Sequence, residues 1–299
     1  IQEWTPNSNY AGAVLAKHKF AAPNGLEIEI LPGSEQVDAV LEVVSGHAEF
    51  GDASADKVLM ANLKGADLVV IGTVSQYSPT CFIALQGSGI RGPQDFVGKK
   101  VAVLTGTNTE KVYRMLLAKL GLPSPLPDEV EAPFDLTSFI NGQYDVRPAF
   151  LYDEPVTLRQ KGKEFTIINP LDYGVKFVGT VYFCRADTMA KKEPLVQKFI
   201  NSVCDGWRFA TRRPEEAITL IKTDWPEVDQ TRELESLKEG MSSFVRKDGR
   251  LLSCVRADWQ QMIADLSSLG GETADLVKID LDKLINNSFV DRYYARVEK

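Results

Sequence analysis

The stretch VVSGHAEFGDAS, residues 43–54, shares a weak sequence pattern with FINGQYDVRPAF, residues 139–150, and we call the two the echoed stretches. Each stretch begins as the apolar end of a predicted helix and passes through a glycine and an aromatic or acidic pair. Each then ends in a short strand that turns into a new helix. The repetition predicts two lobes of similar build, whose equivalent turns face one another across a cleft.

Strand and helix signals alternate around both stretches, which is the rhythm of an α/β fold. A second series starts at KKVAVLTG and continues into a helix that Asn108 or Thr109 caps and Gly121 ends. We expect each lobe to be a mostly parallel sheet flanked by helices. Strands are expected over 26–31, 67–74, 79–86 and 178–187, and helices over 34–44, 194–211, 214–223, 232–244, 257–269 and from 281 onward.

After residue 187 amphipathic helices replace the alternation of strands and helices, and such helices usually wrap a sheet that already exists. The first lobe is therefore predicted to hold residues 1–80 and 183–299, and the second lobe residues 81–182. Because the chain crosses twice between the lobes, the two crossings form a hinge.

Composition excludes several classes of protein. The chain has 299 residues and a net charge of -7, without the basic stripe that binds nucleic acid. No run of about 18 apolar residues is present that would span a bilayer. The chain begins inside an apparent strand, which we interpret as a mature or trimmed N-terminus.

The four cysteines are interpreted as buried free thiols, with a Cys81–Cys184 disulfide as the alternative.

Four turns carry the polar residues that suit a ligand site: WTPNSNY, GDAS, TGTNT and LYDEP. In open α/β sheets a ligand lies beyond the carboxyl ends of the strands, where helices begin with free N–H groups. With Tyr77 at the first crossing, the candidate ligand contacts are Trp4, Asn7, Asn9, Tyr10, Asp52, Ser54, Tyr77, Thr107, Asn108, Tyr152 and Glu154.

None of the four turns contains Arg or Lys, the side chains that usually meet an anionic ligand. Carboxylates and amides instead suit a flat ring with several N–H donors, such as an aminopyrimidine, on which Trp and Tyr stack. Each candidate also has a purely structural alternative. Trp4 is an ordinary core residue in that alternative, Asn9, Asp52 or Ser54 caps a helix, and Glu154 complements a helix dipole.

Signals for catalysis are weak. The chain has two histidines, and it lacks a nucleophile elbow, a phosphate-binding loop, a dinucleotide-binding glycine pattern and a spacing of metal ligands. The glycines of GSGIRG, residues 87–92, are expected to form a loop. We therefore predict no catalytic residue, no metal and no cofactor.

The segments WTPNSNYAGAVLAK, GLEIEIL, VVSGHAEFGDAS and LYDEPV together resemble the solute-binding proteins of ABC importers. The resemblance is to the group related to uptake of thiamin-pyrimidine precursors and to the yeast-type pyrimidine synthase, and it extends from about Glu3 to Asp187. It implies the two-lobed periplasmic-binding-protein fold of type II. It also implies that Trp4, Asn7 and Glu154 contact a heterocycle.

Two positions depart from the family pattern. The family often has His where this chain has Tyr10, which puts one ring contact in doubt and leaves room for a larger ligand such as a flavin. The synthase branch carries a Lys and a His in the segment that here reads GDASADK, where Ala53 and Lys57 occupy their places. This departure argues against an enzyme.

The predicted function is that of an extracytoplasmic receptor, either periplasmic or anchored outside the membrane as a lipoprotein. We expect a monomer that closes on a thiamin pyrimidine precursor or related aminopyrimidine and presents it to an ABC permease in the membrane. Nucleic acid is not an expected partner. The alternatives are a receptor for a small anion of the alkyl sulfonate or nitrate type, a riboflavin receptor, and an enzyme similar to the pyrimidine synthase.

Overall fold

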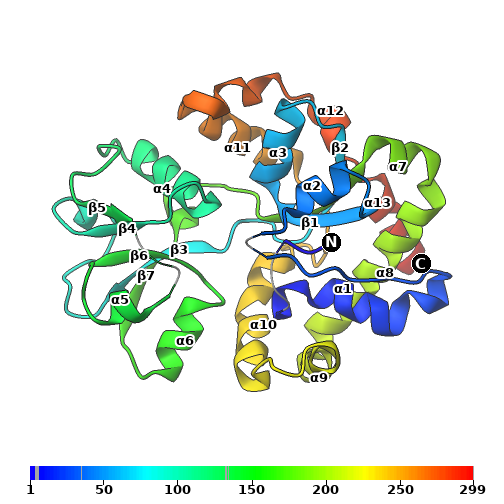
Figure 1. The fold of residues 1–299 in the computed structure, drawn as a ribbon, viewed down its shortest axis with the longest axis horizontal. Helices are drawn as coiled ribbons and strands as arrows, with labels where there is room; N and C mark the ends of the chain where they lie inside the picture. The colour runs from blue at the N-terminus through cyan, green and yellow to red at the C-terminus, as the bar shows by residue number, and fades with distance from the viewer. Residues whose placement is uncertain (4–6, 35, 132, 134, 299) are drawn as a thin grey trace. The chain divides into compact units, whose positions relative to one another are not determined.

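The computed structural model describes residues 1–3, 7–34, 36–131, 133 and 135–298, and it divides into two compact units (Figure 1). The first unit holds Ile1–Gln76, Val178–Ala257 and Lys278–Lys299, and the second holds Tyr77–Phe177 and Asp258–Val277. Residues 258–277 thus belong to the second unit, although the predicted division placed all of 183–299 in the first lobe.

A three-stranded sheet forms the centre of the first unit, in the order β1 (Phe50–Ser54), β8 (Thr180–Arg185), β2 (Leu68–Thr73). The strand β8 runs antiparallel to both neighbours. The N-terminal residues lie along the free side of β1, where the Ile1 amine donates to Phe50 O at 2.8 Å and Asp52 N donates to Ile1 O at 3.0 Å.

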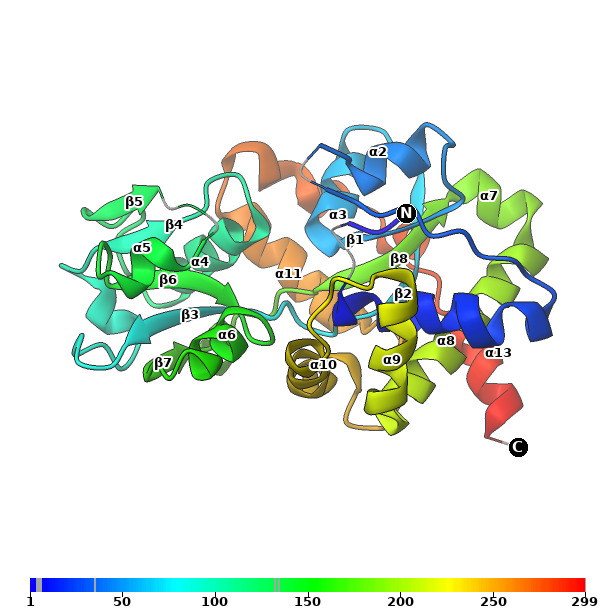
Figure 2. The ribbon, with the colours of Figure 1, turned by 60° about the horizontal axis from the view of Figure 1, so that its bottom comes forward.

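Helices and helical turns cover this first sheet (Figure 1 and Figure 2). They are the 3-10 turns Ser8–Tyr10 and Ala22–Asn24, the π-helical turn Ala16–Phe20, α1 (Ala11–Leu15), α2 (Ala39–Val44), α3 (Ala55–Leu63), α7 (Ala186–Lys191), α8 (Glu193–Arg212), α9 (Pro214–Asp224), α10 (Gln230–Phe244), α12 (Leu281–Leu284) and α13 (Ser288–Val297).

The second unit contains a five-stranded sheet in the order β5 (Glu129–Glu131), β4 (Val101–Val103), β6 (Val146–Phe150), β3 (Thr80–Leu85), β7 (Phe165–Ile168). The strands β5, β4 and β6 are parallel, whereas β3 is antiparallel to β6 and β7. Its helices and 3-10 turns are Pro93–Phe96, α4 (Asn108–Lys119), α5 (Thr137–Ile140), α6 (Glu154–Gln160), Pro170–Tyr173, α11 (Arg256–Ser268) and Gly271–Lys278.

The sheets differ in one respect from the prediction of mostly parallel strands, because the strand pairs of the first sheet are all antiparallel and the second sheet is mixed. The antiparallel strands β3 and β8 are the first strands after the chain enters the second unit at Tyr77 and after it returns at Val178. The chain passes between the units twice more, on either side of residues 258–277, whereas two crossings were predicted. The α/β class with two helix-flanked sheets is confirmed.

The echoed stretches adopt the same local structure. α2 and α5 end just before a glycine with positive φ, Gly46 at 84° and Gly142 at 71°. β1 and β6 then follow, and α3 and α6 begin within a few residues of the strand ends. The prediction of a helix, a glycine, a strand and a new helix in each copy is confirmed, since only glycine adopts this φ without steric cost.

Other local predictions were wrong or shifted. Residues 26–31 form no strand, and backbone bonds from Gln2 N to Leu31 O and from Leu26 N to Ala21 O, both 3.0 Å, anchor the two ends of this segment. The helix expected over 34–44 begins only at Ala39, because Asp38 caps it. The cap of α4 is Thr107 rather than Asn108 or Thr109, and its hydroxyl accepts from Glu110 N.

All four cysteines are buried free thiols, as predicted. Among the described residues, no helix combines the length and the apolar character needed to cross a bilayer.

The closest helix contact in the first unit is between α1 and α8, which lie side by side in both views (Figure 1 and Figure 2). A Cβ on Gly12 would stand 2.1 Å from the Trp207 indole, and a Cβ on Gly206 would stand 2.2 Å from Gly12 O. Trp207 itself is 1% exposed. The two glycines therefore let a large indole fill the space between the helices.

Replacing Gly206 by alanine should lower the free energy of unfolding by about 1–3 kcal/mol, because the new methyl group forces the two backbones apart. Urea denaturation followed by tryptophan fluorescence measures the change. The control is Arg212→Ala at the exposed C-terminal end of α8, which should shift the free energy by less than about 0.5 kcal/mol. Equal effects of the two substitutions would contradict this account of the helix contact.

Candidate functional site

The last residue of each echoed stretch makes the same interaction with a glutamate. Ser54 N donates to Glu3 Oε2 at 2.7 Å, and Phe150 N donates to Glu154 Oε2 at 2.8 Å. Each carboxylate also has a cation beside it, which is Lys57 for Glu3 and Arg147 for Glu154. A shared carboxylate-on-backbone arrangement therefore marks the end of β1 in the first unit and of β6 in the second.

In the first unit, the Glu3 carboxylate links the N-terminal segment to the start of α3. Its Oε1 lies 2.9 Å from Lys57 Nζ and accepts from the Ser54 hydroxyl at 3.4 Å. Burial raises the pKa of Glu3, while the charge of Lys57 opposes the rise. Ser54 occupies the N-cap position of α3, yet its hydroxyl bonds to Glu3 instead of capping the helix.

The loop after the N-terminal segment is organised by two polar contacts. Asn7, not Asn9, is the helix cap, and its side-chain oxygen accepts from Asn9 N at 2.8 Å. Ser8 N donates to Glu233 Oε2 on α10 at 2.7 Å. Tyr10 is only 7% exposed, so most of its ring packs inside the first unit. Trp4 lies outside the described residues.

Glu233 was not predicted from the sequence, although a signal was present. It lies on the buried face of α10 in register with Leu237, and it is 4% exposed. A carboxylate within an apolar helical stripe needs an internal partner, which here is a backbone N–H together with Arg232 Nη1 at 2.7 Å. Glu3 and Lys57 were likewise not among the predicted contacts.

Asp52 is a deeply buried acid of the first unit. It is 3% exposed, and the Ile1 amine and the Glu3 backbone N–H lie near enough to its carboxylate to oppose in part the effect of burial on its pKa. Burial, and next the charge of Glu3, raise the pKa of Asp52 well above its usual value. The carboxyl group is therefore favoured in its neutral form, in which it both donates and accepts hydrogen bonds.

Asp52 also lines a cavity of about 370 Å³ in the first unit. The walls come mainly from residues 26–31 together with Phe50 and Phe199, and the Gln2 amide is among the polar groups that line the cavity. The Gln2 side chain also lacks a partner among the described residues. Of the predicted ligand contacts that the structure describes, Asp52 alone lines this cavity.

In the second unit, the turn before α4 is already occupied by acidic side chains. Thr105 N donates to Glu131 Oε1 at 3.3 Å, and the Thr105 hydroxyl donates to the same carboxylate. Gly106 N donates to Glu110 Oε2 at 2.8 Å. The Thr107 hydroxyl caps α4, and Asn108 is the first residue of that helix. Carboxylates thus accept from two backbone N–H groups of the turn that leads into α4.

Glu154 opens α6, and two bonds hold its carboxylate. Besides the bond from Phe150 N, Arg147 Nη2 lies 3.4 Å from Oε1. Burial raises the pKa of Glu154 to about 7, and the neighbouring charge of Asp153 adds to the rise. The side chain is 16% exposed. A carboxyl group with such a pKa takes up or releases a proton near neutral pH.

The structure shows what two of the predicted tyrosines contact, and it adds two cations that were not predicted. Tyr152 is 7% exposed and stacks on Phe150, with centroids 6.4 Å apart, and the Tyr77 hydroxyl donates to Asp258 at 2.9 Å. Two cations that were not predicted lie beside glutamates, Lys57 beside Glu3 and Arg147 beside Glu154. Sequence reasoning missed them because both stand outside the four turns.

The described residues hold no group of three or more His, Cys, Asp or Glu side chains that would bind a metal ion. The predicted contacts fall into two groups, one in each unit. The first unit holds Asn7, Asn9, Tyr10, Asp52 and Ser54, and the second holds Tyr77, Thr107, Asn108, Tyr152 and Glu154.

A family model described as "NMT1/THI5 like" matches residues 7–217. The chain belongs to this family. A 4-amino-5-hydroxymethyl-2-methylpyrimidine phosphate synthase of Legionella pneumophila is 25% identical over 228 residues, covering 74% of this chain and 71% of the relative. A formylaminopyrimidine-binding protein of Halalkalibacterium halodurans is 20% identical over 274 residues, covering 89% of this chain and 83% of the relative.

Among solved structures, the periplasmic aliphatic sulphonate binding protein SsuA of Escherichia coli matches with a TM-score of 0.74 and 16% identity. The match covers 94% of this chain and 90% of that protein. The NMT1/THI5-like chain therefore has the periplasmic-binding-protein fold, and both the family and the fold predicted from the sequence are confirmed.

The raised pKa of Glu154 makes the stability of this NMT1/THI5-like protein depend on pH. A carboxyl group with a raised folded-state pKa stabilises the fold fully below its unfolded pKa, and this contribution is lost as the pH rises through about 7. Between about pH 4.5 and pH 7.5, Glu154→Gln should gain stability relative to the unmodified protein, by up to about 3 kcal/mol. Urea unfolding at a series of pH values measures the difference.

The matched control is Glu164→Gln, which changes an exposed carboxylate of the same unit. Its free-energy difference from the unmodified protein should stay constant over the same pH range. A Glu154→Gln difference that is equally independent of pH would show that this carboxyl group titrates normally.

Proposed function

We propose that the protein is an extracytoplasmic receptor of an ABC importer that binds an aminopyrimidine of the thiamin-precursor type and delivers it to a membrane permease. Family membership and the periplasmic-binding-protein fold support the receptor class. The two pyrimidine-related relatives support the ligand class. In this proposal the ligand contacts are those predicted from the sequence, without a covalent step.

The observation that carries the proposal is the Glu154 carboxyl group, which stays partly exposed at the start of α6 while Phe150 N and Arg147 hold it. An aminopyrimidine presents a ring nitrogen next to an exocyclic amino group. An ionised carboxylate pairs with this edge when the ring is protonated, and a neutral carboxyl group pairs with it when the ring is neutral. With a pKa of about 7, Glu154 suits both modes.

The surroundings favour an uncharged or weakly basic ring over a small anion. In the turn before α4, the carboxylates of Glu131 and Glu110 accept from Thr105 N and Gly106 N. Lys57 and Arg147 each lie beside a glutamate, so neither presents an unbalanced charge. An anion at these turns would meet carboxylates instead of free cations.

The rival of a different class is a pyrimidine synthase of the same family, which one relative's name suggests. Lys57 is the candidate lysine for such chemistry, but its ammonium group is paired with Glu3 at 2.9 Å. A lysine held as an ion pair is a poor nucleophile. Added pyridoxal phosphate should therefore produce no internal-aldimine absorbance, whereas its appearance would favour the enzyme.

Thermal-shift measurements should separate the possible ligands. We expect 4-amino-5-hydroxymethyl-2-methylpyrimidine to raise the melting temperature, with no shift from ethanesulfonate or riboflavin. Calorimetry should then show that Glu154→Gln weakens pyrimidine binding about 10- to 100-fold, because a charge-assisted hydrogen bond is lost.

Glu164→Gln again serves as the control, and it should bind the pyrimidine with unchanged affinity. A shift with ethanesulfonate alone would replace the proposal by the anion receptor, and a shift with riboflavin alone would replace it by the flavin receptor. Unchanged pyrimidine binding by Glu154→Gln would remove Glu154 from the site.

A further inference from the structure

We propose that Arg147 is a positioning residue for ligand recognition: its guanidinium group holds the Glu154 carboxyl group in the orientation and charge state that the ligand meets. This inference rests on the proposed function, since it assigns the group that prepares Glu154 for a pyrimidine. Arg147 has no predicted role in the sequence pattern, because it lies within β6 and outside the four polar turns.

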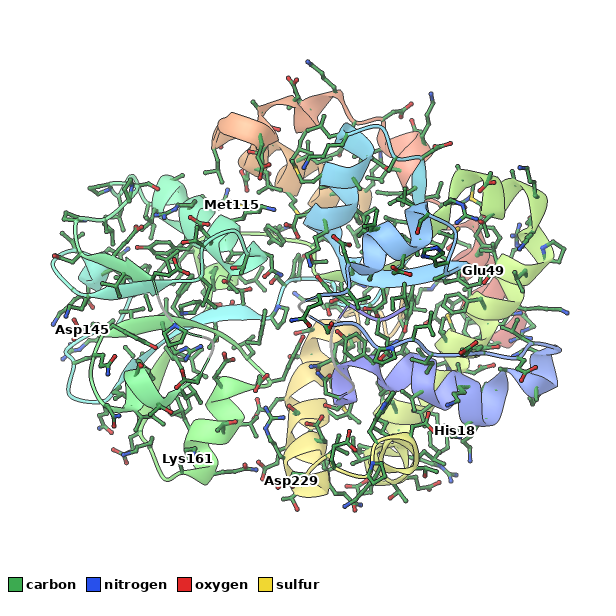
Figure 3. All side chains as sticks on the ribbon, viewed as in Figure 1. His18, Glu49, Met115, Asp145, Lys161 and Asp229 are labelled. Atoms are coloured by element: carbon green, nitrogen blue, oxygen red, sulfur yellow. The ribbon has the colours of Figure 1, made fainter. Side chains whose placement is uncertain are left out.

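Arg147 is deeply buried for a charged residue. It is 1% exposed and ranks among the largest fully buried side chains of the protein. Alternation along β6 places it on the same face as Ala149, which belongs to an apolar cluster with Phe139 and Leu158. Figure 3 labels Asp145, which directly precedes β6, and Lys161, which directly follows α6.

The guanidinium group connects three segments of the chain. Its Nε donates to Pro148 O at 3.0 Å, its Nη1 donates to Asp135 O at 2.6 Å, and its Nη2 faces Glu154 Oε1 at 3.4 Å. Because the guanidinium group is planar and rigid, two anchored nitrogens fix the direction of the third. The position of Nη2, and with it that of Oε1, is therefore set by β6 and by the loop at Asp135.

The distance of 3.4 Å is longer than that of a strong charge-assisted hydrogen bond, which is about 2.7–2.9 Å. Oε1 thus has acceptor capacity left for an N–H group of a ligand, while Oε2 is committed to Phe150 N. Arg147 orients the carboxyl group without saturating it. An ion pair with a purely structural role would gain nothing from leaving the acceptor capacity of Oε1 unused.

Arg147 also acts on the charge of Glu154. The charged and titratable groups that face Glu154 are Asp153 on the preceding turn, Arg147 on β6 and the Cys81 thiol on β3. Burial and Asp153 raise the pKa of Glu154, whereas Phe150 N and the positive charge of Arg147 lower it. Without the guanidinium group, the carboxyl group would hold its proton to higher pH.

The experiment compares Arg147→Met and Arg147→Lys with the unmodified protein by two measurements. Carbon-13 NMR follows the titration of the Glu154 carboxyl group, assigned by its absence in Glu154→Gln. Calorimetry follows binding of 4-amino-5-hydroxymethyl-2-methylpyrimidine from about pH 5.5 to about pH 8.5. The control is Arg114→Met, which removes an ion pair with Glu129 in the same unit.

In Arg147→Met the titration midpoint of Glu154 should rise by at least about one pH unit, and pyrimidine affinity near pH 7.5 should fall at least about tenfold. In Arg147→Lys the positive charge remains, but the planar guanidinium group with its several N–H donors is lost. The titration midpoint of Glu154 should therefore stay within about half a pH unit, while pyrimidine affinity still falls about fivefold or more. Arg114→Met should change neither quantity.

A folded Arg147→Met that leaves both the midpoint and the affinity unchanged would reduce Arg147 to a structural residue. If Arg147→Met does not fold, Arg147→Lys decides: unchanged affinity overturns the proposal, and reduced affinity with an unchanged midpoint supports it. If no pyrimidine binds the unmodified protein, the proposed function fails, but the NMR titration still tests the control of Glu154 by Arg147.

Discussion

The structure depends on the pairing of buried glutamate carboxylates with backbone N–H groups at the points where strands end. A buried N–H group without a partner costs as much as a lost hydrogen bond, and a buried carboxylate without donors costs more. Glu3 and Glu154 remove both costs at Ser54 and Phe150. Glu3 therefore ties the end of β1 to the N-terminal segment, and Glu154 ties the end of β6 to the start of α6.

The same pairing determines the electrostatic character of the candidate site. Each of the two carboxylates has one cation beside it, Lys57 or Arg147. The candidate site therefore contains ion pairs. Asp52 differs, since no Lys or Arg of the described residues forms an ion pair with it and burial dominates its pKa. A carboxyl group in such a setting is neutral over a wider pH range, because burial penalises its ionised form. Neutral and paired groups together suit hydrogen bonding to a polar ring better than attraction of an ion.

The local sequence pattern predicted much of this fold. The long helices α8, α9, α10 and α11 begin and end within two residues of their predicted limits, because apolar residues recur along one face of each. The glycines after α2 and α5 were also identified correctly. Capping residues were predicted less well, since neighbouring polar side chains in the same turn compete for the same backbone N–H group.

By itself, the sequence determined the order of helices and strands, the family and the turns that carry polar residues, because these follow from periodicity and local residue chemistry. Only the tertiary structure decided that β3 and β8 pair antiparallel and that Arg147 lies beside Glu154. Strand direction depends on how the chain re-enters a sheet. The partner of a buried charge depends on which distant segments pack against it, and neither is encoded in a local pattern.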